Sequence, residues 1–112
     1  MPLAFWVCAA ITAVSAAVSL GYSVAGLVGA DGAERTASRY ACARSVALTV
    51  VAIATFPVGS IPFLVAVAVA MVIVQAADAV IGKLIGDRFK TIGPAATAAA
   101  NLAALVWLLT IV

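Results

Sequence analysis

Long uncharged stretches alternate with shorter charged ones along this chain. Residues 1–30, 45–77 and 91–112 contain no charged side chain. The charged side chains, six Lys and Arg and four Asp and Glu, all lie in residues 31–44 and 78–90. A helix that crosses the hydrocarbon core of a bilayer needs about 20 mostly apolar residues. The pattern therefore predicts membrane-spanning helices separated by polar connections.

Four segments reach that length once the helix-breaking residues are taken into account. The predicted helices cover residues 3–29, 38–56, 61–82 and 92–112. Pro57 closes the second helix, and Pro94 suits the first turn of the fourth. The predicted fold is an all-α membrane protein, a single domain of residues 1–112. It forms a four-transmembrane-helix bundle with up-down-up-down topology and short loops.

The distribution of positive charge predicts the orientation of this bundle. With four spans, the loops at residues 30–38 and 83–91 share one face of the membrane, and both termini share the other. Every Lys and Arg lies on, or just inside, the face of the two loops. The positive-inside rule then places both loops in the cytoplasm and both termini outside. We therefore expect a multi-pass protein of the cell (cytoplasmic) membrane.

The composition supports insertion into a lipid bilayer. The chain is 67% hydrophobic and 9% charged, whereas soluble domains are about half apolar and about a quarter charged. The surplus apolar surface is expected to face lipid. The two cysteines, Cys8 and Cys42, fall near opposite ends of their predicted helices. A disulfide needs Cα atoms within about 7 Å of each other, so we predict two free thiols.

The first predicted helix carries a small residue at every fourth position. This stripe consists of Ala9, Ala13, Ala17, Gly21, Ala25 and Gly29. The fourth predicted helix has two similar rows, Ala96, Ala100, Ala104 and Ala95, Ala99, Ala103. Small residues allow close helix packing in lipid. We expect these faces to pack, either within one chain or in a homo-oligomer that uses the stripe of the first helix.

Two charged residues lie inside the predicted spans. Arg44 is five residues inside Arg39, and Asp78 is five residues inside Lys83, so each is about 7 Å below the inner end of its helix. Each also lies at the end of its helix where the macrodipole disfavours its charge. Charges within a membrane are costly and usually face the interior of a bundle. We therefore predict an ion pair between Arg44 and Asp78.

Two amide side chains extend this polar layer. Gln75 is one turn from Asp78, and Asn101 lies about 13 Å into the fourth helix. We expect Arg44, Gln75, Asp78 and Asn101 to line a polar pocket in the cytoplasmic half, with Arg44 and Asp78 as candidate catalytic residues. A purely structural role is the alternative, because Arg44 can extend toward the interface and amides can join helices.

Several kinds of chemistry have no support in the sequence. The chain has no His and only two Cys, so we expect no metal site and no cofactor. It has no glycine-rich phosphate loop. Its basic loops are short and also contain acidic residues, so we expect no nucleic-acid partner. The expected partners are the lipid bilayer and a small apolar or amphipathic ligand.

Two resemblances to known families bear on these expectations. Four predicted helices in a chain of this length resemble the small multidrug resistance transporters, which use a membrane-embedded Glu in their first helix. This chain has no acidic residue in its first predicted helix. That departure removes the residue on which the activity of those transporters depends.

The second resemblance rests on three short segments. The stretch Arg39-Tyr-Ala-Cys-Ala-Arg44, residues 75–78, and Gly93-Pro94-Ala95-Ala96 are similar to a family of small four-helix membrane proteins of unknown function, akin to the DoxX-like proteins. The resemblance implies a four-helix fold and carries over Arg44 and Asp78 as family positions. The chain departs from the family pattern at Ser45, where an acid is common, and it has no His near Asn101.

Three functional hypotheses follow from these patterns. The first is a polar pocket that binds a small, partly apolar ligand, in a membrane-embedded isomerase, cyclase or redox accessory protein. The second is a proton-coupled, dimeric small transporter in which Asp78 carries the proton. The third is a structural subunit of a membrane complex. The sequence leaves open whether the protein is an enzyme.

Overall fold

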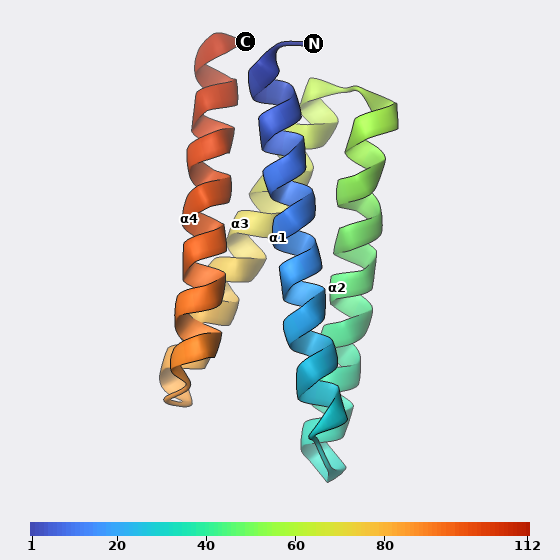
Figure 1. Cartoon of the computed structure of the whole chain (residues 1–112), viewed down its shortest axis with the longest axis vertical. Helices are drawn as coiled ribbons and strands as arrows, with labels where there is room; N and C mark the ends of the chain where they lie inside the picture. The colour runs from blue at the N-terminus through green and yellow to red at the C-terminus, as the bar shows by residue number, and fades with distance from the viewer.

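The computed structural model describes residues 1–112 and consists of four helices (Figure 1). They are α1 (Leu3–Val28), α2 (Gly32–Val58), α3 (Ile61–Leu84) and α4 (Arg88–Ile111). Each helix is long and apolar enough to cross a membrane. The predicted all-helical chain with four candidate spans is confirmed, and this set of helices is typical of a multi-pass membrane protein.

Both chain termini lie at one end of the bundle, together with the connection between α2 and α3 (Figure 1). We call this the terminal end. The opposite end carries the connections at residues 29–31 and 85–87, and we call it the loop end. Helix α1 contacts the other three helices, whereas α2 and α4 do not contact each other. Of the contacting pairs, α2 and α3 contact each other least.

The second and fourth helices begin earlier than predicted. Helix α2 starts at Gly32 rather than at residue 38, and α4 starts at Arg88 rather than at residue 92. The Asp87 carboxylate accepts a hydrogen bond from the backbone N–H of Lys90 at 3.1 Å and so caps α4. The prediction began these helices at residues 38 and 92, because it followed the apolar sequence. Backbone hydrogen bonding does not need a lipid environment, so both helices extend into charged sequence.

The turn between α2 and α3 lies close to its predicted position, although α2 ends at Val58 rather than at residue 56. Pro57 lies in the last turn of α2, and Gly59 follows with a φ of 61°, in the left-handed region that glycine readily adopts. The Ser60 hydroxyl accepts a hydrogen bond from the backbone N–H of Phe63 at 3.3 Å. This cap fixes the start of α3 at Ile61, as predicted from the sequence.

Helices α3 and α4 approach each other closely at the loop end. Gly82 of α3 is buried, and a Cβ atom added there would overlap the Lys90 carbonyl group and lie 2.8 Å from the backbone nitrogen of Thr91. Pro94 lies inside α4 and has no N–H to bond the carbonyl of Lys90. The glycine thus packs directly against a backbone carbonyl for which Pro94 supplies no i+4 donor.

The terminal half of the bundle contains the main apolar core. Its largest members, Phe5, Leu64 and Leu108, are fully buried and come from α1, α3 and α4. A second cluster joins α1, α2 and α3 through Ala16, Ala52, Val67 and Met71. Both cysteines are free thiols, as predicted. The apolar core that α1, α3 and α4 share therefore lies away from the loop end.

Most of the small-residue stripe of α1 does not pack within the chain. Ala9 is buried and Ala13 is half-buried, but the four members nearer the loop end are exposed: Ala17, Gly21, Ala25 and Gly29. In α4 only Ala104 of the two alanine rows is buried. The expectation of packing within one chain is wrong for these exposed positions, because α1 instead buries a neighbouring face that includes Ser15 and Ala16. Packing between subunits stays a prediction.

Candidate functional site

An ion pair joins α2 to α3 in the loop half of the bundle. Arg44 Nη2 lies 3.1 Å from Asp78 Oδ1 and donates a second, longer hydrogen bond of 3.3 Å to Oδ2. The predicted pairing of these two residues is therefore confirmed. The Arg44 side chain is 44% exposed and that of Asp78 is 21% exposed. Both hydrogen bonds come from one nitrogen, so Nε and Nη1 of Arg44 have no partner in the chain.

Gln75 lies one turn from Asp78 and is almost completely buried, with 1% of its surface exposed. Its Nε2 donates a hydrogen bond of 2.9 Å to the backbone carbonyl of Ser15 on α1. A carbonyl oxygen only accepts, so the amide nitrogen must face Ser15. The amide oxygen Oε1 is then buried without a hydrogen-bond partner, which costs about 1–3 kcal/mol when nothing else binds it.

Three serines connect α1 to α2 beside these residues. The fully buried Ser45 hydroxyl lies 3.2 Å from Ser19 Oγ and 3.1 Å from Ser23 Oγ. Ser23 also donates a hydrogen bond to the backbone carbonyl of Ser19 at 3.0 Å. Sequence reasoning considered Ser45 only as a departure from a family pattern. The i, i+4 spacing of Ser19 and Ser23 was the available signal for a polar partner on α2.

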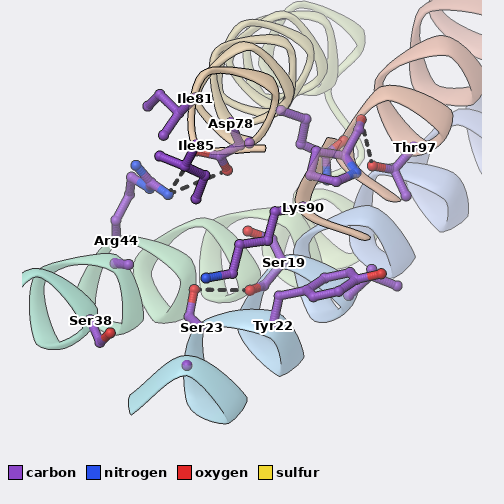
Figure 2. Close-up of a pocket in the computed structure, with 16 residues that line it drawn as sticks. Ser19, Tyr22, Ser23, Ser38, Arg44, Asp78, Ile81, Ile85, Lys90 and Thr97 are labelled. Carbon is purple, nitrogen blue, oxygen red and sulfur yellow. Dashed lines mark hydrogen bonds and ion pairs between the residues drawn. The ribbon is translucent and has the colours of Figure 1, made fainter. Parts of the chain in front are cut away.

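All of these residues except Ser15 and Ser45 line a cavity of about 180 Å³ at the loop end (Figure 2). It lies where α3 and α4 diverge from α1 and α2, and all four helices contribute to it. Its polar lining includes Ser19, Ser23, Arg44, Gln75, Asp78 and Lys90. Its apolar lining includes Val18, Ala41, Ile81, Ile85 and Pro94. Three of the four predicted site residues, Arg44, Gln75 and Asp78, thus share one cavity.

The fourth predicted residue, Asn101, does not line this cavity. It is fully buried one helical turn beyond the cavity-lining Thr97, and its Nδ2 donates a hydrogen bond of 3.1 Å to Thr12 Oγ1. The Thr12 hydroxyl donates its own proton to the carbonyl of Cys8. It can therefore only accept from Asn101, and Asn101 Oδ1 has no partner. Asn101 joins α4 to α1 above the cavity, because its depth along α4 exceeds that of Gln75 along α3.

Lys90 and Tyr22 are among the lining residues that the predicted site did not include. Lys90 was assigned to a loop, and only the early start of α4 places it on the cavity wall. Asp87, a residue type favoured at the N-cap position, is the signal that indicates this start. From the sequence, Tyr22 is a candidate for the aromatic belt at the inner membrane interface. Its hydroxyl would lie only 2.6 Å from a Cβ atom added to Gly93, so it packs against α4 at a position without a side chain.

Comparisons of this chain with known protein families, with curated proteins and with solved structures gave no significant match. The two resemblances described above therefore rest on the residues quoted for them. No three His, Cys, Asp or Glu side chains lie together where they would hold a metal ion. The functional interpretation depends on the geometry of the cavity itself.

Proposed function

We propose that this protein spans the cytoplasmic membrane with an up-down-up-down topology and binds a small, partly apolar ligand in the loop-end cavity. The loop end would face the cytoplasm and both termini would lie outside. The distribution of Lys and Arg supports this orientation, because all six lie in the half of the bundle nearer the loop end. A cytoplasmic cavity of this kind would be open to water or to lipid head groups.

The observation that carries the proposal is the unpartnered amide oxygen of Gln75. Buried polar atoms are nearly always hydrogen-bonded, and this one belongs to a residue that lines a cavity. A bound molecule with a hydrogen-bond donor would satisfy it. The apolar part of the cavity lining, which includes Val18, Ile81 and Pro94, would contact the rest of the ligand.

The closed terminal half favours binding over passage through the bundle. Phe5, Leu64 and Leu108 fill that half and are fully buried, and none of them lines the cavity. The cavity is therefore one-sided. If the ligand also reacts, as in an isomerase or cyclase, Asp78 is the group to accept its proton and Arg44 the group to stabilise the resulting negative charge.

Cysteine labelling on intact cells tests the proposed orientation. With Cys8 and Cys42 replaced by Ala, a membrane-impermeant maleimide should label Val112→Cys on intact cells. It should label Glu34→Cys only after the cells are permeabilised. Both positions are exposed and lie at opposite ends of the bundle. The reverse labelling pattern would show that the protein is inserted in the opposite orientation.

The cavity itself is tested with a neighbouring pair of cysteines in the same Cys8→Ala, Cys42→Ala background. Ser23→Cys lines the cavity, whereas Val24→Cys is exposed on the outer surface of α1. A small cationic methanethiosulfonate reacts with thiolates that water reaches. It should therefore modify Ser23→Cys at least about tenfold faster than Val24→Cys, because a thiol in hydrocarbon does not ionise readily.

Slow reaction at both positions would show a dry bundle and would overturn the proposed pocket. Native mass spectrometry of the gently extracted protein supplies the second readout. A small molecule that co-purifies with the wild type, and is retained less by Gln75→Leu, supports binding at the unpartnered amide oxygen. A molecule retained equally by Gln75→Leu lies elsewhere on the protein.

A further inference from the structure

Arg44 has hydrogen-bonding capacity that its ion pair does not use. A guanidinium carries five N–H donors, and Arg44 uses only Nη2 to donate to Asp78. The donors on Nε and Nη1 have no partner within the chain. A planar guanidinium edge of this kind matches the oxygens of a phosphate or carboxylate. Arg44 can therefore bind an anion while it keeps its contact with Asp78.

Lys90 adds a second positive charge to the cavity. Figure 2 shows its side chain reaching from α4 toward the edge of the cavity formed by Ser19 and Ser23. The Arg44–Asp78 pair is the only salt bridge in the chain, so Lys90 has no acidic partner. The cavity lining thus contains two basic residues, Arg44 and Lys90, and one acidic residue, Asp78. One positive charge of the lining is therefore not balanced, and it favours binding of an anion.

Gln75, which lines the same cavity, carries a buried acceptor one helical turn from Asp78. Gln75 and Asp78 are three residues apart on one face of α3, a spacing that separates their Cβ atoms by about 5–6 Å. An anion bound to Arg44 beside Asp78 would therefore lie near Gln75 Oε1, which lacks a donor. A hydroxyl group adjacent to the anionic group of the same ligand would provide that donor.

Two exposed apolar side chains belong to the cavity lining. They are those of Ile81 and Ile85, and both are more than half exposed, at 55% and 62%. Figure 2 shows them beside the Arg44–Asp78 pair, at the junction of α2 and α3. This is the least extensive of the helix contacts. A cavity of about 180 Å³ holds several waters, so it fits a head group, while an attached chain would lie over the two isoleucines.

We propose that the ligand of this cavity is a single-chain amphiphile with a phosphate head group and an adjacent hydroxyl, taken from the cytoplasmic leaflet between α2 and α3. Arg44 and Lys90 bind the phosphate, and Gln75 Oε1 accepts from the hydroxyl. Basic pockets between helices on the cytoplasmic side are known to bind anionic lipid head groups. This inference rests on the proposed function and assigns the chemical class of its ligand.

The binding experiment uses the full-length protein in detergent micelles and native mass spectrometry, with each probe at equal mole fraction. The probes are 1-oleoyl-lysophosphatidate, oleyl phosphate without the hydroxyl, uncharged 1-oleoylglycerol, and glycerol 3-phosphate without the chain. We expect 1-oleoyl-lysophosphatidate to bind at least about tenfold more tightly than 1-oleoylglycerol, because charged hydrogen bonds discriminate strongly. Oleyl phosphate should bind with intermediate affinity.

Charge variants separate the cavity from general attraction to a basic surface. Lys90→Gln should weaken binding of 1-oleoyl-lysophosphatidate about fivefold, the upper range for a solvent-exposed charge contact. Lys83→Gln is the matched control, because Lys83 has the same charge at the same end of the bundle but does not line the cavity. It should leave the affinity unchanged. The Lys90 side chain makes no hydrogen bond or ion pair in the chain, so its replacement leaves the fold intact.

The hydroxyl contact has its own test. Gln75→Leu should abolish the affinity difference between 1-oleoyl-lysophosphatidate and oleyl phosphate, while both remain preferred over 1-oleoylglycerol. Equal effects of Lys90→Gln and Lys83→Gln, or equal binding of charged and uncharged amphiphiles, would overturn the inference. Glycerol 3-phosphate binding as tightly as the lysophospholipid would identify a soluble phosphate ester instead and overturn the lipid assignment.

These outcomes are distinguishable from failure of the proposed function. If the cavity has a different kind of ligand, Ser23→Cys still reacts rapidly with the methanethiosulfonate while the phosphate amphiphiles show no preference. If there is no open cavity, Ser23→Cys fails to react, and the probes with different head groups bind equally. The cysteine reaction therefore tests the cavity, and the comparison of probes tests its ligand.

Discussion

Gly82→Ala should destabilise the protein by about 1–3 kcal/mol, the usual range for overpacking a well-packed site. The added methyl group would overlap the Lys90 carbonyl and crowd the Thr91 backbone nitrogen. These neighbours are backbone atoms, so no side-chain rotation can relieve the overlap. Helices α3 and α4 would have to separate where their connection at residues 85–87 holds them together.

Gly21→Ala is the matched control for this substitution. Gly21 is also helical, but an added Cβ atom would meet nothing within 4 Å. Since Ala favours a helix over Gly by about 0.5–1 kcal/mol, this variant should be neutral or slightly more stable. Unfolding by sodium dodecyl sulfate in mixed micelles measures both changes. Equal stability of the two variants would show that α3 and α4 do not approach closely at Gly82.

Asp78→Ala should destabilise the protein by about 2–3 kcal/mol when it is embedded in a bilayer, because it leaves Arg44 as an unpaired charge within a span. The double variant Arg44→Ala, Asp78→Ala removes both charges and should recover much of that loss. Replacing both partners of an ion pair is commonly far less harmful than removing one. The changes in unfolding free energy caused by the two single substitutions should therefore be strongly non-additive.

A double-mutant cycle in lipid nanodiscs measures this coupling. Arg39 supplies the control, since it lies on the same helix and carries the same charge but makes no ion pair with Asp78. The cycle of Arg39→Ala with Asp78→Ala should be additive within about 0.5 kcal/mol. If the Arg44 cycle is equally additive, the ion pair makes no contribution to stability across the α2–α3 junction.

The position of this ion pair gives it a role in the cavity as well as in stability. It bridges α2 and α3 where these helices contact each other least. The same residues form part of the cavity lining. A change in the Arg44–Asp78 contact would therefore alter both the packing of the junction and the charge presented to a ligand.

Charge placement alone was sufficient to predict the Arg44–Asp78 pair. The two residues lie at matching depths in the predicted spans, and each opposes the dipole of its own helix, so each needs a partner of opposite charge. The first residues of α2 and α4 were harder to predict from the sequence. A run of apolar residues indicates which part of a helix can contact lipid, but not where its backbone hydrogen bonding begins. Asp87 starts α4 within charged sequence, and that early start places Lys90 on the cavity wall.

The sequence by itself determined the four apolar helices and the depth of their polar residues, because hydrophobic length and charge segregation are properties of consecutive residues. Only the tertiary structure decided which polar residues share a cavity, since that depends on the rotation and divergence of the helices. The divergence of α3 and α4 from α1 and α2 opens the cavity to Arg44, Gln75 and Lys90. Closer packing above it buries Asn101 against Thr12.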